Sequence, residues 1–156
     1  MIKHRLAEDM KQAMKQGDRT RLDCVRMLRS RLLEREVALR PQKGTQYEIE
    51  DDEALQVIAT YAKQRRESIE SFRQAGREEL ASREEAELAI VEGYLPPQLG
   101  EAQLRSIVAE VVAETGAASS RDTGKVMKAV MARVRGAADG KLVSRLVGEA
   151  LAGRQG

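Results

Sequence analysis

The chain has 156 residues, of which 33% are charged and only 3% are aromatic, with no Trp. This length suffices for one domain or two small ones with a buried core. The abundance of Leu, Ala, Val, Glu and Arg argues against a β-sandwich or barrel, so the composition predicts an all-α fold.

The net charge of +2 hides an uneven distribution. Residues 1–41 carry +5, residues 42–120 carry −8 and residues 121–156 carry +5. Basic ends allow polyanion binding, although ordinary solvated helix surface is the alternative for the N-terminal excess. A single cysteine, Cys24, excludes an internal disulfide, and we see neither a leader at Met1 nor an apolar run of membrane-spanning length. These features predict a cytoplasmic protein that makes no membrane contact.

The first two helices are expected over residues 2–15 and 19–39, and the second should form an antiparallel hairpin with the third helix, which follows it. Gly17 is placed to end the first helix, and Asp18 is placed to cap the second. Pro41 is expected to stop the second helix, because proline lacks the backbone N–H that a helix interior needs.

A loop over 40–50 should then lead into a third helix that closes near Gly76. Asp51 and Asp52 are expected to cap its first turn. Its spacing resembles a heptad interrupted by Arg65, whose side chain should snorkel or pair with an acid. The positions of this seam are Leu55, Ile58, Ala62, Arg65, Ile69 and Phe72.

Ser82 precedes Glu85 by three residues, the spacing of a capping box, and predicts the start of a helix that ends near Gly93. Pro96 and Pro97 then enforce an extended segment. We expect an N-terminal helical domain, a Pro-rich linker and a small three-helix C-terminal domain. These domains are assigned to residues 1–95, 96–100 and 101–156, with the three short helices at 101–115, 122–135 and 140–152.

Catalytic and metal-binding sets are lacking in the sequence. His4 is the only His, so neither His/Cys zinc chemistry nor a His-based triad has enough groups. Thr123-Gly124-Lys125 resembles the end of a phosphate-binding loop, but Ser119 and Val126 stand where that motif needs Gly and Ser or Thr. We therefore expect no metal, no cofactor and no catalytic residue, although helix N-termini attract phosphates.

The helix predicted over 122–135 is the most informative element. It has an apolar side, formed by Val126, Met127, Val130, Met131 and Val134, and an opposite cationic side, formed by Arg121, Lys125, Lys128 and Arg135. Gly136 is expected as a left-handed cap and Asp139 as the N-cap of the last helix. Lys141 opposes the dipole of that helix and, with Arg145, extends the cationic row.

Four segments in order resemble the YqeY family, which is similar to the tail of GatB, the tRNA-recognising subunit of the glutamine-dependent tRNA amidotransferase. The segments are Lys63–Arg77, Tyr94–Leu99, Gly124–Lys128 and Ala138–Val143. The resemblance implies an all-α protein whose C-terminal domain contacts tRNA. It also links the chain to carbon–nitrogen ligase activity with glutamine as amido-N-donor, although the catalytic parts of that complex are absent here.

The leading hypothesis is therefore a non-catalytic accessory module that binds the phosphate backbone of tRNA or another structured RNA. Its alternative is an adaptor that docks on a tRNA-processing, aminoacylation or amidotransferase partner through the helix over 51–75, using Arg66, Arg73 and Arg77. An enzyme that forms carbon–nitrogen bonds is a third, weaker possibility. The residues predicted to bind RNA are Arg121, Lys125, Lys128, Arg135, Gly136, Asp139, Gly140, Lys141 and Arg145.

Overall fold

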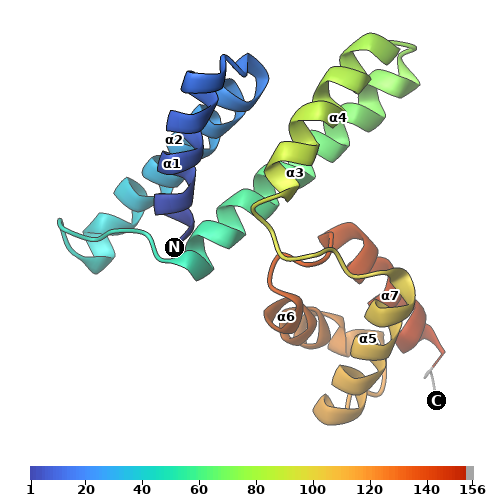
Figure 1. The fold of residues 1–156 in the computed structure, drawn as a ribbon. Helices are drawn as coiled ribbons and strands as arrows, with labels where there is room; N and C mark the ends of the chain where they lie inside the picture. Colours follow the sequence, from blue (N-terminus) through green and yellow to red (C-terminus); the bar gives the residue numbers. More distant parts are fainter. Residues whose placement is uncertain (154–156) are drawn as a thin grey trace. The chain divides into compact units, whose positions relative to one another are not determined.

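The structure, a computed structural model, describes residues 1–153, and these contain seven α-helices and no β-strand. The predicted all-α fold is thus confirmed. The chain divides into two compact units between Leu95 and Pro96 (Figure 1). Within residues 1–153, no helix is long and apolar enough to cross a membrane.

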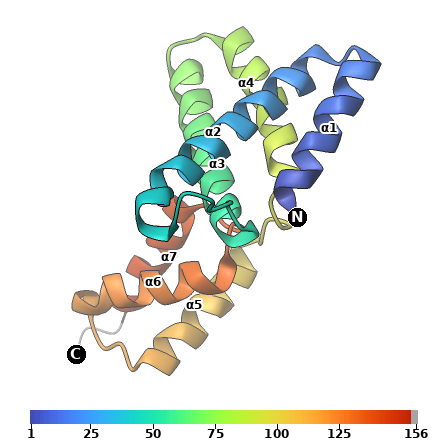
Figure 2. The same ribbon diagram turned by 90° about the vertical axis from the view of Figure 1, so that its left-hand side faces the viewer.

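The N-terminal unit consists of two helical hairpins, the first helix with the second and the third with the fourth (Figure 2). The expected hairpin of the second and third helices is therefore wrong, because the tight turns at Gly17 and Gly76 pair the helices that they join. The first turn forms as predicted, because Gly17 adopts a left-handed conformation (φ 68°) and the Asp18 carboxylate accepts a hydrogen bond from the backbone N–H of Arg21 at 3.1 Å. The four helices are α1 (Ile2–Gln16), α2 (Arg19–Lys43), α3 (Asp51–Gln74) and α4 (Glu78–Glu92).

The expected stop of α2 at Pro41 is wrong. The helix continues through Pro41 to Lys43, and Gly44 (φ 106°) ends it. A proline removes only its own N–H, and the last turn is still closed by the backbone N–H of Gly44, which donates to the carbonyl of Arg40 at 2.8 Å. The loop therefore spans 44–50 rather than 40–50.

Asp51 and Asp52 lie in the first turn of α3, which confirms the expected favourable charge at this end of the helix. Two predicted side-chain caps, by Asp51 and by Ser82, are wrong. The Asp51 carboxylate accepts a hydrogen bond from the backbone N–H of Ile2 and lies near the N-terminal ammonium, both at 2.9 Å, so it caps α1 instead of α3. Both donors lower the pKa of Asp51 below its usual range. Ser82 lies inside α4, because this helix already begins at Glu78, directly after the turn at Gly76.

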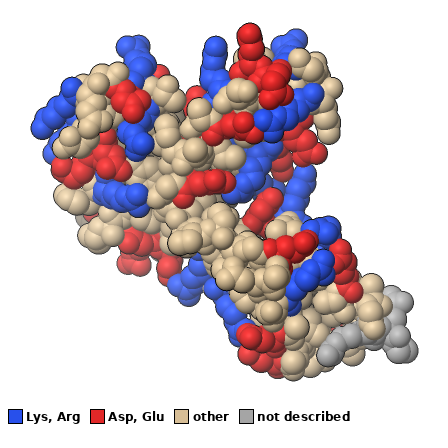
Figure 3. All heavy atoms as spheres, turned by 45° about the vertical axis from the view of Figure 1, so that its right-hand side comes forward, with Lys and Arg blue, Asp and Glu red and all other residues tan. Residues whose placement is uncertain are grey.

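Ion pairs join α3 to α4. The guanidinium of Arg65 donates to Glu84 at 3.0 Å, which confirms that this Arg in the apolar seam pairs with an acid. Arg66 donates to Glu92 at 2.9 Å. Acidic and basic side chains alternate in the same way over much of the face shown in Figure 3. Neighbouring opposite charges thus neutralise much of the surface of this unit.

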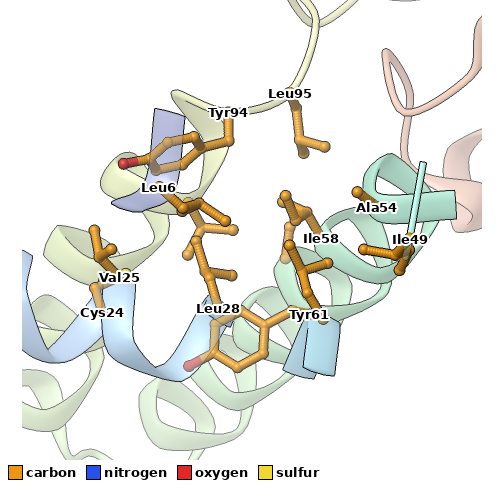
Figure 4. Close-up of a cluster of buried hydrophobic side chains, with 13 residues drawn as sticks. Leu6, Cys24, Val25, Leu28, Ile49, Ala54, Ile58, Tyr61, Tyr94 and Leu95 are labelled. Atoms are coloured by element: carbon orange, nitrogen blue, oxygen red, sulfur yellow. The ribbon is translucent and has the colours of Figure 1, made fainter. Parts of the chain in front are cut away.

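The hydrophobic core of the N-terminal unit collects side chains from all four helices. Leu6, Leu28 and Ile58 are completely buried, and Figure 4 shows them between α1, α2 and α3. Tyr94 closes one side of this core, where its hydroxyl donates to Asp9 and its ring lies beneath the guanidinium of Arg5. The end of α4 is thereby attached to α1.

Glu36 is the buried acid of this unit, with 2% of its surface exposed. Its carboxylate accepts hydrogen bonds from Lys3 Nζ at 2.8 Å, from Arg40 at 3.1 Å and from the backbone N–H of Ile49 at 2.9 Å. The hydrogen bond from Lys3 is the main cause that lowers the pKa of Glu36, against the opposing effect of burial. One carboxylate thus connects α1, α2 and the loop before α3.

The C-terminal unit is a three-helix bundle around a core rich in Val and Leu. Its helices begin and end within one residue of the predicted ranges, and Val126, Val130 and Val134 are buried as expected. All three helix pairs contact one another. The elements are α5 (Glu101–Thr115), the short 3₁₀ helix η1 (Ser120–Asp122), α6 (Thr123–Val134) and α7 (Gly140–Ala152).

Replacing Glu36→Gln should lower the free energy of unfolding by about 2 kcal/mol, because three donors lose a charged acceptor. Urea unfolding followed by circular dichroism measures this loss. Glu34→Gln is the matched control: Glu34 is exposed on the same helix and its contact with Arg31 is a long 3.8 Å, so we expect a change below about 0.5 kcal/mol. Equal effects of the two substitutions would contradict the assigned role of Glu36.

The free energy of unfolding should depend on pH through the protonation of Glu36. Its pKa in the folded protein is lowered, so the stabilisation is complete above the unfolded value of about 4.3 and is lost as the pH falls through the folded pKa. Between about pH 5 and about pH 3, the parent protein should therefore lose more stability than the Glu36→Gln variant. Urea unfolding at a series of pH values tests this, and parallel curves would rule it out.

Candidate nucleic-acid interface

Helix α6 presents cations opposite its buried valines, as the sequence predicts. Lys125 and Lys128 are exposed on α6, and Arg121 is exposed on η1 immediately before it. The Nζ of Lys125 donates to the backbone carbonyl of Thr115 at 3.3 Å, so this amine caps the end of α5. Within residues 1–153, the side chains of Arg121 and Lys128 make no hydrogen bond or ion pair.

The turn between α6 and α7 holds a second group of predicted residues. Gly136 has a φ of 80°, which confirms the expected left-handed conformation, and Arg135 before it also has a positive φ of 29°. Asp139 caps α7 as predicted, since its carboxylate accepts from the backbone N–H of Lys141 at 3.3 Å. Gly140 begins α7. The side chain of Lys141 is exposed and makes no ion pair among the described residues.

Two residues that sequence reasoning missed fix this turn. The Gln98 side chain donates to the carbonyl of Gly136 at 2.9 Å, and the backbone N–H of Leu99 donates to the carbonyl of Ala137 at 2.7 Å. The extended segment after Pro97 therefore packs on the bundle. Backbone hydrogen bonds of this kind leave no pattern in the sequence.

Arg145 differs from the other predicted cations because its side chain pairs with acids. Its guanidinium donates to Glu101 of α5 and, at 3.5 Å, to Glu149 of its own helix. Arg133, which was not predicted to bind RNA, pairs with Glu110 at 3.1 Å and Glu114 at 2.6 Å in the same manner. These two arginines hold α7 and α6 against α5, so they are less available to an external anion.

The remaining cations form two groups. Lys125 and Lys128 lie in the first half of α6, whereas Arg135 and Lys141 lie at the turn after its end. Six residues lead from Lys128 to Val134, which corresponds to about 9 Å along the helix axis. The row of cations expected from the sequence is therefore interrupted over the second half of α6.

The chemistry of the described residues beyond these cations is limited. No group of three or more His, Cys, Asp or Glu among residues 1–153 is placed to hold a metal ion. The Cys24 thiol is buried, and mainly because of burial its pKa rises to about 11. A thiol with this pKa carries almost no thiolate at neutral pH and is a poor nucleophile.

The alternative docking face on α3 is largely occupied within the protein. Arg66 pairs with Glu92, and Arg73 pairs with both Glu85 and Glu78 of the neighbouring helix. Their guanidinium groups stabilise the α3–α4 hairpin. A partner that binds these arginines would have to compete with the carboxylates of α4.

Fold and site together define an all-α protein with a four-helix unit and a small cationic bundle. The chain belongs to the family described as Yqey-like protein, whose model matches residues 3–151. This confirms the family resemblance inferred from the sequence.

Two mitochondrial relatives bear the name "Altered inheritance of mitochondria protein 41, mitochondrial". The one from Pyrenophora tritici-repentis is 31% identical over 149 residues, which cover 93% of this chain and 78% of the relative. The one from Eremothecium gossypii is 28% identical over 90 residues, which cover 58% of this chain and 46% of the relative. These names state a compartment and a mutant phenotype for the relatives but no molecular activity.

The turn should respond to glycine substitutions in a predictable way. Gly136→Ala should destabilise the bundle by about 1–2 kcal/mol, because an L side chain is strained at positive φ. Gly124→Ala is the matched control: it lies in α6, where an added Cβ has no neighbour within 4 Å, and it should stabilise by up to about 1 kcal/mol. Urea unfolding would measure both, and effects of the same sign would contradict the described turn.

Proposed function

We propose that this protein is a non-catalytic accessory module that binds structured RNA, tRNA in particular, through its C-terminal unit. The observation that carries the proposal is a set of exposed cations that have no acidic partner among the described residues, Arg121, Lys128 and Lys141. In the same bundle Arg105, Arg133 and Arg145 pair with glutamates. Unpaired cations at the start of a helix are unfavourable for folding alone. An anionic ligand gives them a role.

The composition of the C-terminal unit supports recognition of phosphate rather than bases. Residues 96–156 contain no Phe, Tyr, Trp or His. Proteins that read unpaired bases stack them on such rings, whereas recognition of backbone and shape needs cations at suitable spacing. The two cationic groups, Arg121 with Lys125 and Lys128 and Arg135 with Lys141, are separated along α6 so that they can contact different phosphates.

The similarity of the family to the GatB tail supports tRNA as the RNA and a protein of tRNA aminoacylation or amidation as a further partner. The proposal includes no reaction for the protein itself. The names of both relatives place them in mitochondria. A cytoplasmic location of this protein therefore stays a prediction.

The test is fluorescence anisotropy of labelled, folded tRNA titrated with the full chain across a salt series. The sequence alone suggested six phosphate contacts and a log–log slope of about −4 to −5. Because Arg145 is paired with glutamates, we now expect about five contacts and a slope of about −3.5 to −4.5. Absence of binding at low salt would refute the proposal.

A charge-matched pair of variants locates the surface. The triple substitution Lys125→Glu, Lys128→Glu and Lys141→Glu should abolish tRNA binding. Its control, Lys11→Glu, Lys15→Glu and Lys63→Glu, changes the net charge equally on exposed positions of the N-terminal unit and should retain most of the affinity. If both triples lose affinity equally, the net charge rather than the C-terminal surface governs binding. Circular dichroism confirms that each variant is folded.

A further inference from the structure

Helix α2 has apolar side chains on two opposite faces. One face packs into the core, whereas Met27, Leu33 and Val37 are 44%, 56% and 49% exposed. Together with Ser30, these residues lie within about 120° of arc on the side of α2 opposite its buried residues. We refer to Met27, Ser30, Leu33 and Val37 as the outer stripe. Three of the five large apolar side chains that are exposed among the described residues belong to it.

A groove of about 460 Å³ between α2 and α3 adjoins one edge of this stripe. Its walls include the amide and hydroxyl side chains of Gln56, Thr60 and Gln64 of α3, together with two ion pairs. Arg35 pairs closely with Glu53 at 2.6 Å, whereas Arg31 is only loosely engaged, at 3.8 Å from Glu34. The groove thus offers amide and hydroxyl donors and one weakly paired guanidinium beside an apolar surface.

The charge of α2 indicates what kind of partner fits. The helix carries eight Arg and Lys against three acids, a net charge of +5. One of those acids, Glu36, is buried and pairs with Arg40, so these two charges cancel and the net positive charge of the helix remains. Arg26 lies within the outer stripe, between Leu33 and Val37, and Arg29 lies at its edge away from the groove, where it contacts the Met10 sulfur of α1 at 3.0 Å; both arginines are exposed. The stripe is therefore an apolar row with one cation inside it and a cation at each edge.

From these observations we propose that the outer stripe and the α2–α3 groove form a docking site for an acidic amphipathic helix of a partner protein. Leucine-like residues three and four apart on that helix pack on Leu33 and Val37, and its flanking carboxylates meet Arg26, Arg29 and Arg31. A second copy of this chain would place one helix of charge +5 against another. RNA would leave the apolar side chains uncovered. Charge and apolarity together favour the acidic helix.

The probe is a fluorescein-labelled 18-residue helical peptide with Leu at alternating three- and four-residue spacing and Glu at the flanking positions. Two comparison peptides carry Lys in place of Glu, or Ala in place of Leu. We expect the acidic Leu peptide to bind the full chain with a dissociation constant in the micromolar range, as small transient interfaces do. Both comparison peptides should bind at least about tenfold more weakly.

Variants of the protein place the site. Leu33→Ala with Val37→Ala keeps helix propensity and should weaken binding of the acidic peptide at least about tenfold. Arg26→Glu with Arg29→Glu should weaken it similarly and reduce its salt dependence. Met14→Ala is the matched control, because Met14 is a similarly exposed apolar residue (55%) that belongs to α1 and not to the outer stripe, and it should leave binding unchanged. Thermal unfolding verifies that each variant is folded.

Several outcomes would overturn this docking site. Equal binding of the Glu and Lys peptides, unchanged binding by the Leu33/Val37 variant, or no binding at about 1 mM protein would each do so. Sedimentation equilibrium gives a further test: a dimer that the Leu33/Val37 variant abolishes would assign the stripe to a second copy. Loss of tRNA binding in the Arg26/Arg29 variant, with displacement of the peptide by tRNA, would assign it to RNA.

Discussion

The buried carboxylate of Glu36 is the constraint from which the N-terminal unit follows. A carboxylate removed from water needs donors, and here α1, α2 and the loop before α3 each supply one. The donor from the loop, Ile49, also contributes its side chain to the core. Two residues later, Asp51 reaches the first turn of α1. The position of α1 is thus set twice, through Glu36 and through Asp51.

Repeating apolar positions identified the helices well but not their caps. In the C-terminal unit, three separate rows of Val and Leu made the helices evident, because each row spans its helix. Asp51, Ser82 and Pro41 carry local signals of equal strength, yet tertiary contacts overrode them. Asp51 accepts a hydrogen bond from the first turn of α1, which is far away in the sequence. Ser82 lies within a helix that begins four residues earlier, at Glu78. Helix α2 continues past Pro41 and ends at Gly44.

The sequence identified the cations of the candidate interface but not which of them are paired. Arg145 and Lys141 look equivalent on a helical wheel, four residues apart on α7. Only the packing of α5 against α7 places Glu101 beside Arg145 and leaves Lys141 without an acid. Such a difference depends on the register of two helices that are 25 or more residues apart in the chain. The fold of the bundle also brings the Gln98 side chain to the carbonyl of Gly136. No local sequence pattern predicts this hydrogen bond.

The C-terminal bundle separates cations that stabilise from cations that do not. Arg105, Arg133 and Arg145 connect helices through glutamates. Lys141 lies at the positive end of the α7 dipole, where Asp139 caps the backbone but no acid among the described residues pairs with the Lys141 side chain. A residue that lowers stability, at a position where another residue type would be neutral, is often present because it serves a function. The split between paired and unpaired cations is therefore more informative than the net charge of the unit.

The hydrogen bond from Lys125 to Thr115 links ligand capture to local order. The amine that faces outward on α6 is also the group that closes the last turn of α5. An ammonium group carries three N–H donors, so this amine can bind a phosphate while it still donates to the Thr115 carbonyl. The hydrogen bond to Thr115 then holds the amine in position for an anion, and by reciprocity an anion bound there would stabilise the end of α5. In this bundle, affinity and rigidity at one helix end are coupled through a single ammonium group.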